Sequence, residues 1–282
     1  MEKIQTKYLT GERALFGKTD AEIYDSTFAD GESPLKESNN IKLFNCSFKW
    51  KYPLWYSQNI NAFDCILTET ARSGIWYTKN ITMENCLIEA PKTFRRSSNI
   101  TLTNVTMPNA LETFWNCETI KLDNVVAKGD YFGLNSNKIL INNLTLFGNY
   151  SFDGGKDIEI HNSKLISKDA FWNAENVTVY NSYISGEYLG WNSKNVTFVN
   201  CTIESLQGMC YMDNVVLKNC KTLNTTLAFE YSTVNAQING SIDSIFNPQA
   251  GTITVDEIKE LILEEDKIDP SKTLINRGKN DV

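Results

Sequence analysis

One phrase, typified by residues 80–89 (NITMENCLIE), recurs along the chain and constrains its fold more than any other feature. Close variants are NIKLFNCSFK, NITLTNVTMP, NVTVYNSYIS, NVTFVNCTIE and NVVLKNCKTL. Aligned on the first aliphatic residue, the copies follow one another at spacings of 19 to 21 residues: Ala21, Ile41, Ile60, Ile81, Ile100, Ile120, Ile139, Ile158, Val177, Val196 and Val215. Because one copy cannot bury its own apolar face, so regular a period indicates a solenoid of stacked copies.

Each copy is built from short strands. An apolar residue stands two positions after the first one, as Met83 follows Ile81, and this alternation is typical of a strand with one buried face. A second strand follows an Asn turn, and a third precedes each phrase, as in PLWYS and GIWYT. We therefore predict an all-β fold: a single-stranded right-handed parallel β-helix of about twelve rungs of 19–21 residues.

An Asn column supports this prediction. Four residues after the first aliphatic residue, the chain carries Asp25, Asn45, Asp64, Asn85, Asn104, Asn124, Asn143, Asn162, Asn181, Asn200 and Asn219. Asn tolerates the left-handed backbone of a sharp turn. Its amide also donates to and accepts from the same amide one rung away. We expect an asparagine ladder along one corner.

The end of the chain has a different pattern. In TVDEIKELILEEDKIDP, Val255, Ile258, Leu261 and Ile262 recur at helical spacing, and Asp256 and Glu257 suit the first turn of a helix. A helix here would cover the last sheet edge, which otherwise invites pairing with another chain. We therefore predict a parallel β-helix over residues 1–250 and a C-terminal cap helix and tail over residues 251–282; a partner-docking helix is the alternative.

The net charge and the composition limit the kinds of partner that the protein is expected to bind. The net charge of −7 disfavours nucleic acid and anionic membranes, which need clustered Lys and Arg. No apolar run approaches the 18 residues of a membrane span, and the first residues lack the apolar centre of a secretory signal. The seven cysteines follow the repeat and not a disulfide framework. We expect a bacterial cytoplasmic protein with reduced cysteines, without cofactor or metal.

The organisation resembles the pectin-lyase-like superfamily of right-handed parallel β-helices over nearly the whole chain. More narrowly, YLTGERALF, DGESPLKES, KWKYPLWYS, EAPKTFRRS, KGDYFG, SKDAFWN and SGEYLGWNS are similar to an uncharacterised bacterial family known only as a domain of unknown function. The resemblance implies the fold and no activity. The N-T-D, Asp-Asp and G-H-G motifs of polygalacturonases are missing, and the only histidine is His161.

A column of large residues marks the face that would carry function. Five residues before each first aliphatic residue, the chain reads Phe16, Lys36, Trp55, Trp76, Arg95, Trp115, Leu134, Asp153, Trp172, Trp191, Cys210 and Tyr231. Alternation with inward residues such as Phe94 and Phe171 places this column on the outside. Outward rings suit stacking on sugar faces, because large exposed apolar patches usually mark a binding surface. The alternatives are a second small core under the loops and a protein-binding face.

Charged residues interrupt the column near its middle. Arg95 and Asp153 lie within it, Arg96 follows directly, and the adjoining loops bring Lys92, Glu112, Asp130, Lys168, Asp169 and Glu187. Carboxylates would act as acid and base and arginines would hold a uronate, although charges in solvent loops are common. The candidate catalytic residues are Asp153, Asp130, Asp169 and Arg95, and the candidate substrate-binding residues are Trp76, Arg96, Trp115, Trp172 and Trp191.

Two classes of function follow from this face. The first is a carbohydrate-binding or carbohydrate-active protein that takes an oligosaccharide or uronate; as an enzyme it would be a glycan hydrolase, lyase or epimerase. The second is a non-catalytic scaffold whose face binds a protein. The sequence does not decide between binding and catalysis, and it does not indicate an oligomeric state.

Overall fold

The computed structural model describes residues 1–278, which form two compact units, residues 1–147 and residues 148 onward. Unit 1 contains strands β1 (Glu2–Gln5), β2 (Tyr8–Leu9), β3 (Thr19–Tyr24), β4 (Thr27–Phe28), β5 (Asn39–Phe44), β6 (Ser47–Phe48), β7 (Gln58–Phe63), β8 (Ile66–Leu67), β9 (Ile75–Trp76), β10 (Lys79–Glu84), β11 (Leu87–Ile88), β12 (Phe94–Arg95), β13 (Ser98–Met107), β14 (Glu118–Lys128) and β15 (Asn137–Phe147), with one 3₁₀ turn, η1 (Glu69–Ala71).

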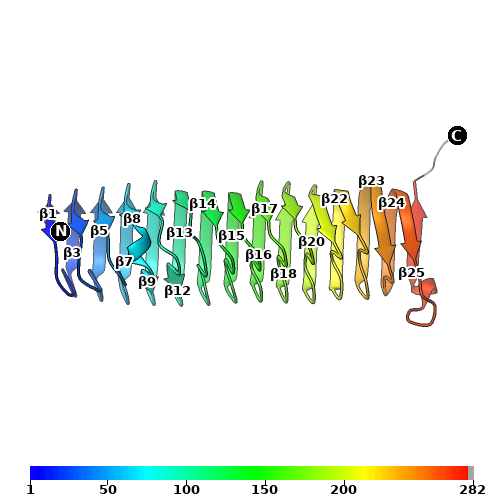
Figure 1. Cartoon of the computed structure of the whole chain (residues 1–282), viewed down its shortest axis with the longest axis horizontal. Helices are drawn as coiled ribbons and strands as arrows, with labels where there is room; N and C mark the ends of the chain where they lie inside the picture. The colour runs from blue at the N-terminus through cyan, green and yellow to red at the C-terminus, as the bar shows by residue number, and fades with distance from the viewer. Residues whose placement is uncertain (279–282) are drawn as a thin grey trace. The chain divides into compact units, whose positions relative to one another are not determined.

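Unit 2 contains strands β16 (Lys156–His161), β17 (Lys164–Ile166), β18 (Glu175–Tyr180), β19 (Tyr183–Ser185), β20 (Lys194–Val199), β21 (Thr202–Leu206), β22 (Asp213–Thr226), β23 (Thr233–Phe246), β24 (Ala250–Ile262) and β25 (Thr273–Arg277), with the 3₁₀ turn η2 (Pro270–Lys272). Within each unit, equivalent strands of successive rungs lie side by side (Figure 1). The predicted parallel β-helix is confirmed.

The register of the strands follows the repeat. Ile81 of β10 pairs with Ile100 of β13, and Ile100 pairs in turn with Ile120 of β14, all in parallel. The same alignment holds in unit 2, where Val177 pairs with Val196. The phrase thus defines both the strand and its partner one rung away.

The described residues hold about fifteen rungs, and not twelve. Eight begin with the first long strand of each turn in unit 1, and seven do so in unit 2. The predicted count omitted three rungs: that of β1, in which Glu2 pairs with Ala21, and those of β24 and β25. These end rungs lack the complete repeated phrase with its Asn, so the sequence repeat did not predict them.

The predicted C-terminal cap helix is wrong. Residues 250–262 form strand β24, in which Val255 pairs with Ile238 and Ile258 with Ile242 of β23. The three-residue step from Val255 to Ile258 looked helical, but it is the corner of a rung, with the same spacing as Leu217 and Cys220 in β22. The last four residues of the predicted helix and tail, 279–282, lie outside the described residues.

The asparagine ladder is confirmed within both units. Asn104 donates to Asn85 at 3.1 Å, and Asn200 donates to Asn181 at 3.2 Å while accepting from Asn219 at 2.7 Å. These residues have positive φ, near 54° at Asn104 and Asn200. A second ladder at the preceding corner was not predicted; Asn99 donates to Asn80 at 2.8 Å.

The interior is filled by columns of like residues. Aromatic rings stack from rung to rung, as Phe94 does on Phe114 with ring centroids 4.8 Å apart. Buried hydroxyls satisfy backbone groups of neighbouring rungs, as Ser97 Oγ does by donating to the Ile75 carbonyl at 2.9 Å. All seven cysteines are buried and unbridged. The core is continuous and filled within each unit, so a functional site is expected on the outer surface.

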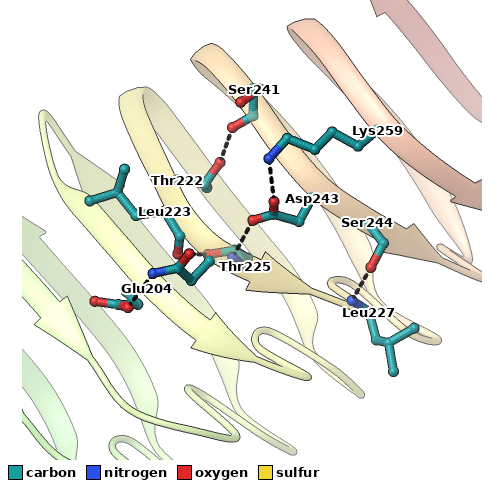
Figure 2. Close-up of polar contacts among 10 residues, drawn as sticks. Glu204, Thr222, Leu223, Thr225, Leu227, Ser241, Asp243, Ser244 and Lys259 are labelled. Carbon is teal, nitrogen blue, oxygen red and sulfur yellow. Dashed lines mark hydrogen bonds and ion pairs between the residues drawn. The ribbon is translucent and has the colours of Figure 1, made fainter.

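A polar network supports the last rungs of unit 2, where the strand register shifts between β21 and β22 and between β23 and β24. Figure 2 shows the backbone N–H of Thr225 donating to Asp243, which also pairs with Lys259, at 2.9 and 2.6 Å. The Leu227 N–H donates to Ser244 Oγ at 2.7 Å. Side chains here accept hydrogen bonds from backbone N–H groups that lack a partner in the shifted strand ladder. This network therefore has a structural role.

Candidate functional site

The tryptophan column points outward but is half-buried in both units. Trp55, Trp76 and Trp115 belong to unit 1, and Trp172 and Trp191 to unit 2; all five have intermediate exposure. Most of their indole N–H groups donate to a backbone carbonyl near the next rung, as Trp76 does to Lys92 at 2.9 Å and Trp191 to Gln207 at 2.6 Å. The column is therefore anchored to the fold by these hydrogen bonds.

In unit 1 the column forms a continuous stack, named here the Arg95 stack: Trp55, Trp76, Arg95 and Trp115. Trp55 lies on Trp76 with centroids 5.1 Å apart and planes 9° apart. The Arg95 guanidinium carbon lies 4.7 Å from the Trp76 ring centroid and 4.4 Å from that of Trp115. Arg95 thus fills the space between two indoles, where a ligand ring would otherwise have to enter.

The charges around this stack are largely compensated. Glu112 Oε2 accepts from Arg95 Nη2 at 3.0 Å and lies 3.0 Å from Lys92 Nζ. Arg95 Nε is buried and has no hydrogen-bond partner. Arg96 points elsewhere, with its guanidinium 5.9 Å from the Tyr77 ring centroid. Asp130 lies in the adjoining loop, where its carbonyl accepts from the Glu112 N–H. Arg95 has the contacts of a structural residue.

Unit 2 presents a hollow on the same column. This cavity of about 330 Å³, named here the Trp172 pocket, is lined by Tyr150, Lys168, Asp169, Trp172, Tyr188, Trp191 and Gln207. Three predicted site residues, Asp169, Trp172 and Trp191, therefore meet in one pocket. Trp172 is tilted by 50° from Trp191, with centroids 5.8 Å apart, in contrast to the parallel rings of unit 1.

The pocket exists because one position in a column of long side chains is short. Tyr150, Asp169, Tyr188 and Gln207 follow at 19-residue intervals, three residues before the main column. All four have positive φ, between 48° and 58°, so they occupy the same corner of successive rungs. Asp169 is much smaller than the tyrosines at either side, and the difference in volume opens the hollow above it.

Glycine allows the rungs to approach closely beside the pocket. Gly186 has φ of 155°, and a Cβ at this position would lie 2.0 Å from the Ser167 carbonyl oxygen. Within the loop, the Asp169 N–H donates to the Glu187 carbonyl at 2.8 Å. Any larger residue at position 186 would force the two loops apart and change the pocket.

Asp169 is the chemically distinctive residue of the pocket. It is 1% exposed, and its Oδ2 has no hydrogen-bond partner. Burial raises the pKa of Asp169; Lys168 and hydrogen bonding from Tyr150 oppose this rise, whereas Glu187 and Asp153 add to it. Unpartnered buried polar atoms are rare and costly, so a donor that reached this oxygen would remove that cost.

Two further groups define the rim. Lys168 Nζ lies 3.3 Å from Glu187 and 5.1 Å from the Tyr188 ring centroid. Within residues 1–278 the Trp172 indole N–H has no protein acceptor, unlike that of Trp191. The lining thus combines polar groups, among them the Asp169 carboxyl and the Lys168 ammonium, with several aromatic rings.

Asp153 does not line this pocket. It lies in the main column, half-buried, and its Oδ1 accepts from the Asn173 side chain at 3.2 Å. Its charge still raises the pKa of Asp169. The predicted residues therefore form two clusters, with Trp76, Arg95, Arg96, Trp115 and Asp130 in unit 1 and Asp153, Asp169, Trp172 and Trp191 in unit 2.

Sequence reasoning missed Tyr150, Tyr188 and Gln207. The signal was available, because these residues keep the 19-residue spacing with Asp169. What the spacing did not reveal is that a short residue between long ones makes a cavity.

A second hollow has no such unpartnered buried group in its lining. This hollow, of about 390 Å³ near the end of unit 2, is lined by Tyr231, Thr233, Gln249, Ala250, Lys267, Ile268, Asp269 and Lys272, and Lys267 is paired with Glu264. No cluster of three or more His, Cys, Asp or Glu suited to a metal ion occurs in residues 1–278. That part of the chain also has no helix of the length and apolarity needed to cross a membrane.

Comparison with known proteins shows a family and a fold. A family model described as "Protein of unknown function (DUF3737)" matches residues 2–276. No curated protein matched the chain.

Solved structures with a similar fold include the tailspike protein of E. coli bacteriophage HK620, with 10% identity and a TM-score of 0.52 over 91% of this chain. The match covers 62% of the tailspike chain. The surface adhesin PfbA of Streptococcus pneumoniae matches at 12% identity and a TM-score of 0.41, over 90% of this chain and 71% of its own. The A-module of the Azotobacter vinelandii mannuronan C-5 epimerase AlgE4 matches at 10% identity and a TM-score of 0.30, over 99% and 89%. At such identities the likeness to the tailspike shows the parallel β-helix alone.

Proposed function

We propose that this chain, which belongs to the DUF3737 family of proteins of unknown function, binds saccharides in the Trp172 pocket. The observation that carries the proposal is a buried carboxyl oxygen without partner on Asp169, a residue that lines an aromatic cavity. A volume of about 330 Å³ falls at the lower end of the usual range for small-molecule pockets, roughly 300–1,000 Å³.

A sugar ring matches the groups that the pocket offers. The C–H face of a pyranose is apolar and flat enough to lie on Trp172 or Trp191. Its hydroxyls donate and accept at the ring edge, where they would meet Asp169 Oδ2 and the Trp172 N–H. A purely apolar ligand would leave the buried Asp169 Oδ2 unsatisfied, at a cost of about 1–3 kcal/mol.

Binding is proposed in preference to catalysis. Glycan hydrolysis generally uses two carboxyl groups that flank one bond. The lining of the Trp172 pocket holds one carboxyl, that of Asp169, and Asp153 lies outside the lining. The predicted hydrolase, lyase or epimerase activity therefore has less support than recognition of a glycan without its conversion.

The direct test is a panel of neutral, acidic and amino oligosaccharides titrated against the protein, followed by tryptophan fluorescence and calorimetry. Trp172→Ala should weaken binding of any ligand found by about tenfold, equivalent to roughly 1.4 kcal/mol, because the ring face on which the sugar lies is removed. The matched control is Trp50→Ala in unit 1, which should leave affinity unchanged. If no oligosaccharide binds, the scaffold function becomes the better proposal.

Cellular context is part of the same proposal. The net charge of −7 supports a protein that binds neither nucleic acid nor an anionic membrane surface. We propose a cytoplasmic location, which fractionation of cells that express the native protein would test. Recovery of the protein from a secreted or membrane fraction would contradict it.

A further inference from the structure

We infer that the Trp172 pocket selects a sugar that carries a protonated primary amino group, bound with its ammonium on Asp169 and between the surrounding rings. The inference rests on the proposed function, because it names the kind of saccharide that the same pocket takes. It goes beyond it because neutral sugars and uronates would satisfy saccharide binding equally well.

The first support is the number of rings around the carboxyl. Tyr150, Trp172, Tyr188 and Trp191 line the cavity together with Asp169. A cation within about 6 Å of an aromatic ring face is attracted by the negative face of the ring, and the effect grows when water is excluded. The pocket already shows this preference at its rim, where Lys168 Nζ lies 5.1 Å from the Tyr188 ring centroid.

The second support is the balance of charge. Lys168 is the only cation of the lining, and Glu187 pairs with it at 3.3 Å. The charges that remain are those of Asp169 and of Asp153, which lies close enough to act on it. A cationic ligand would compensate this excess, whereas a uronate would add a further negative charge.

The third support is the unpartnered oxygen itself, which distinguishes between kinds of cation. A quaternary ammonium has no N–H and would leave Asp169 Oδ2 unsatisfied. A primary ammonium donates up to three hydrogen bonds and would satisfy it with a charge-assisted one. The geometry therefore favours an amino sugar over a choline-like group.

The test compares glucosamine oligomers with N-acetylglucosamine oligomers of equal length, at a pH at which the sugar amine is protonated. Acetylation removes the charge and keeps the ring. We expect the amine form to bind at least about tenfold more tightly, as a hydrogen bond to a charged group contributes roughly 1.5–3 kcal/mol. Asp169→Asn should abolish this preference, and Asp157→Asn, which removes an exposed carboxylate of unit 2 outside the pocket, should preserve it.

Each other outcome overturns the inference in a recognisable way. Equal binding of both oligomers would leave the proposed saccharide function standing and refute the selection of an amine. Binding of neither would refute both. A lysine-containing peptide that bound as tightly as the glucosamine oligomer, with the same dependence on Asp169, would show that the pocket reads an amine without reading a sugar.

Proton linkage offers a second readout. Protonation of Asp169 would remove its attraction for an ammonium, so affinity for the glucosamine oligomer should fall as pH drops through the pKa of this carboxyl. The groups that face it are Lys168, Glu187, Asp153 and Tyr150. Asp169→Asn should flatten this part of the pH profile, and a profile unchanged by the substitution would contradict the assignment.

Discussion

The Arg95 stack in unit 1 and the Trp172 pocket in unit 2 are built on the same repeated position yet have opposite properties. In the stack, flat groups lie in contact and Glu112 compensates the central charge. In the pocket, the rings are tilted and a buried carboxyl oxygen has no partner. The repeat therefore fixes where rings stand, whereas single residues decide whether the space between them is filled.

The difference arises from one residue in each unit. At position 95 a long planar side chain replaces a tryptophan and completes the stack. At position 169 a short side chain stands between Tyr150 and Tyr188 and leaves a cavity. A solenoid can gain a binding site in this way without any change to its backbone.

Refilling the cavity should have the largest effect. Asp169→Tyr introduces the residue type found at positions 150 and 188, whose backbones have the same φ as position 169 within a few degrees. The ring would occupy the pocket, so saccharide affinity should fall by about 100-fold or more, equivalent to roughly 2.7 kcal/mol. Calorimetric titration measures this loss.

The control for this variant is Ser33→Tyr. Ser33 holds the equivalent corner of a unit 1 rung, also with positive φ. It should fold and bind as the wild type does. If Asp169→Tyr folds normally and retains its affinity, the Trp172 pocket is not the binding site.

Removing the central cation of the stack should have a smaller effect, on stability alone. Arg95→Ala takes away two guanidinium–indole contacts and one ion pair, which together should lower the free energy of unfolding by about 1–3 kcal/mol. Urea denaturation followed by tryptophan fluorescence measures the change. The exposed Lys121→Ala should change stability by less than about 0.5 kcal/mol. A loss of saccharide binding in Arg95→Ala without a loss of stability would place function in the stack.

The smallest expected effect is the pH dependence contributed by Asp169. Burial raises its folded pKa above the unfolded value of about 3.9. A raised pKa stabilises the fold below the unfolded value, and that contribution is lost as pH rises through the folded value. Asp169→Asn cannot ionise, so it should become more stable relative to wild type as pH rises through this window.

Denaturation midpoints of both proteins across that pH range would reveal the trend. Lys168, Glu187, Asp153 and Tyr150 face the carboxyl and are the same in both proteins, so the difference isolates position 169. If Asp169→Asn instead became less stable relative to wild type as pH rises, Asp169 would be stabilised in its charged form, and the raised pKa would be wrong.

The fold could be predicted where the sequence repeat is regular, and it could not be predicted where the repeat is interrupted. Ile81, Asn85 and their counterparts define strand, corner and register, because stacking requires equal residues at equal positions. The same logic failed at Val255 and Ile258, where a corner of the rung has the spacing of a helix. Pattern alone cannot separate the two without the pairing partner.

The candidate site was predictable in part. The outward column located Trp172 and Trp191, and its adjoining loops located Asp169, but Arg95 was ranked as an equal candidate. Arg95 proves to be enclosed by Trp76 and Trp115, while Asp169 lines a cavity. Which outward residues pack on one another depends on side-chain volume in three successive rungs, and an alignment of single positions does not contain that information.

The most direct test of the account is an indole N–H spectrum of the protein with ¹⁵N-labelled tryptophan, titrated with a glucosamine oligomer. The six signals can be assigned by single Trp→Phe variants. We predict the largest shift at Trp172, a smaller one at Trp191, and none at Trp55, Trp76 or Trp115, whose N–H groups donate to backbone carbonyls. Shifts confined to Trp55, Trp76 or Trp115 would contradict the account and place binding on the stack.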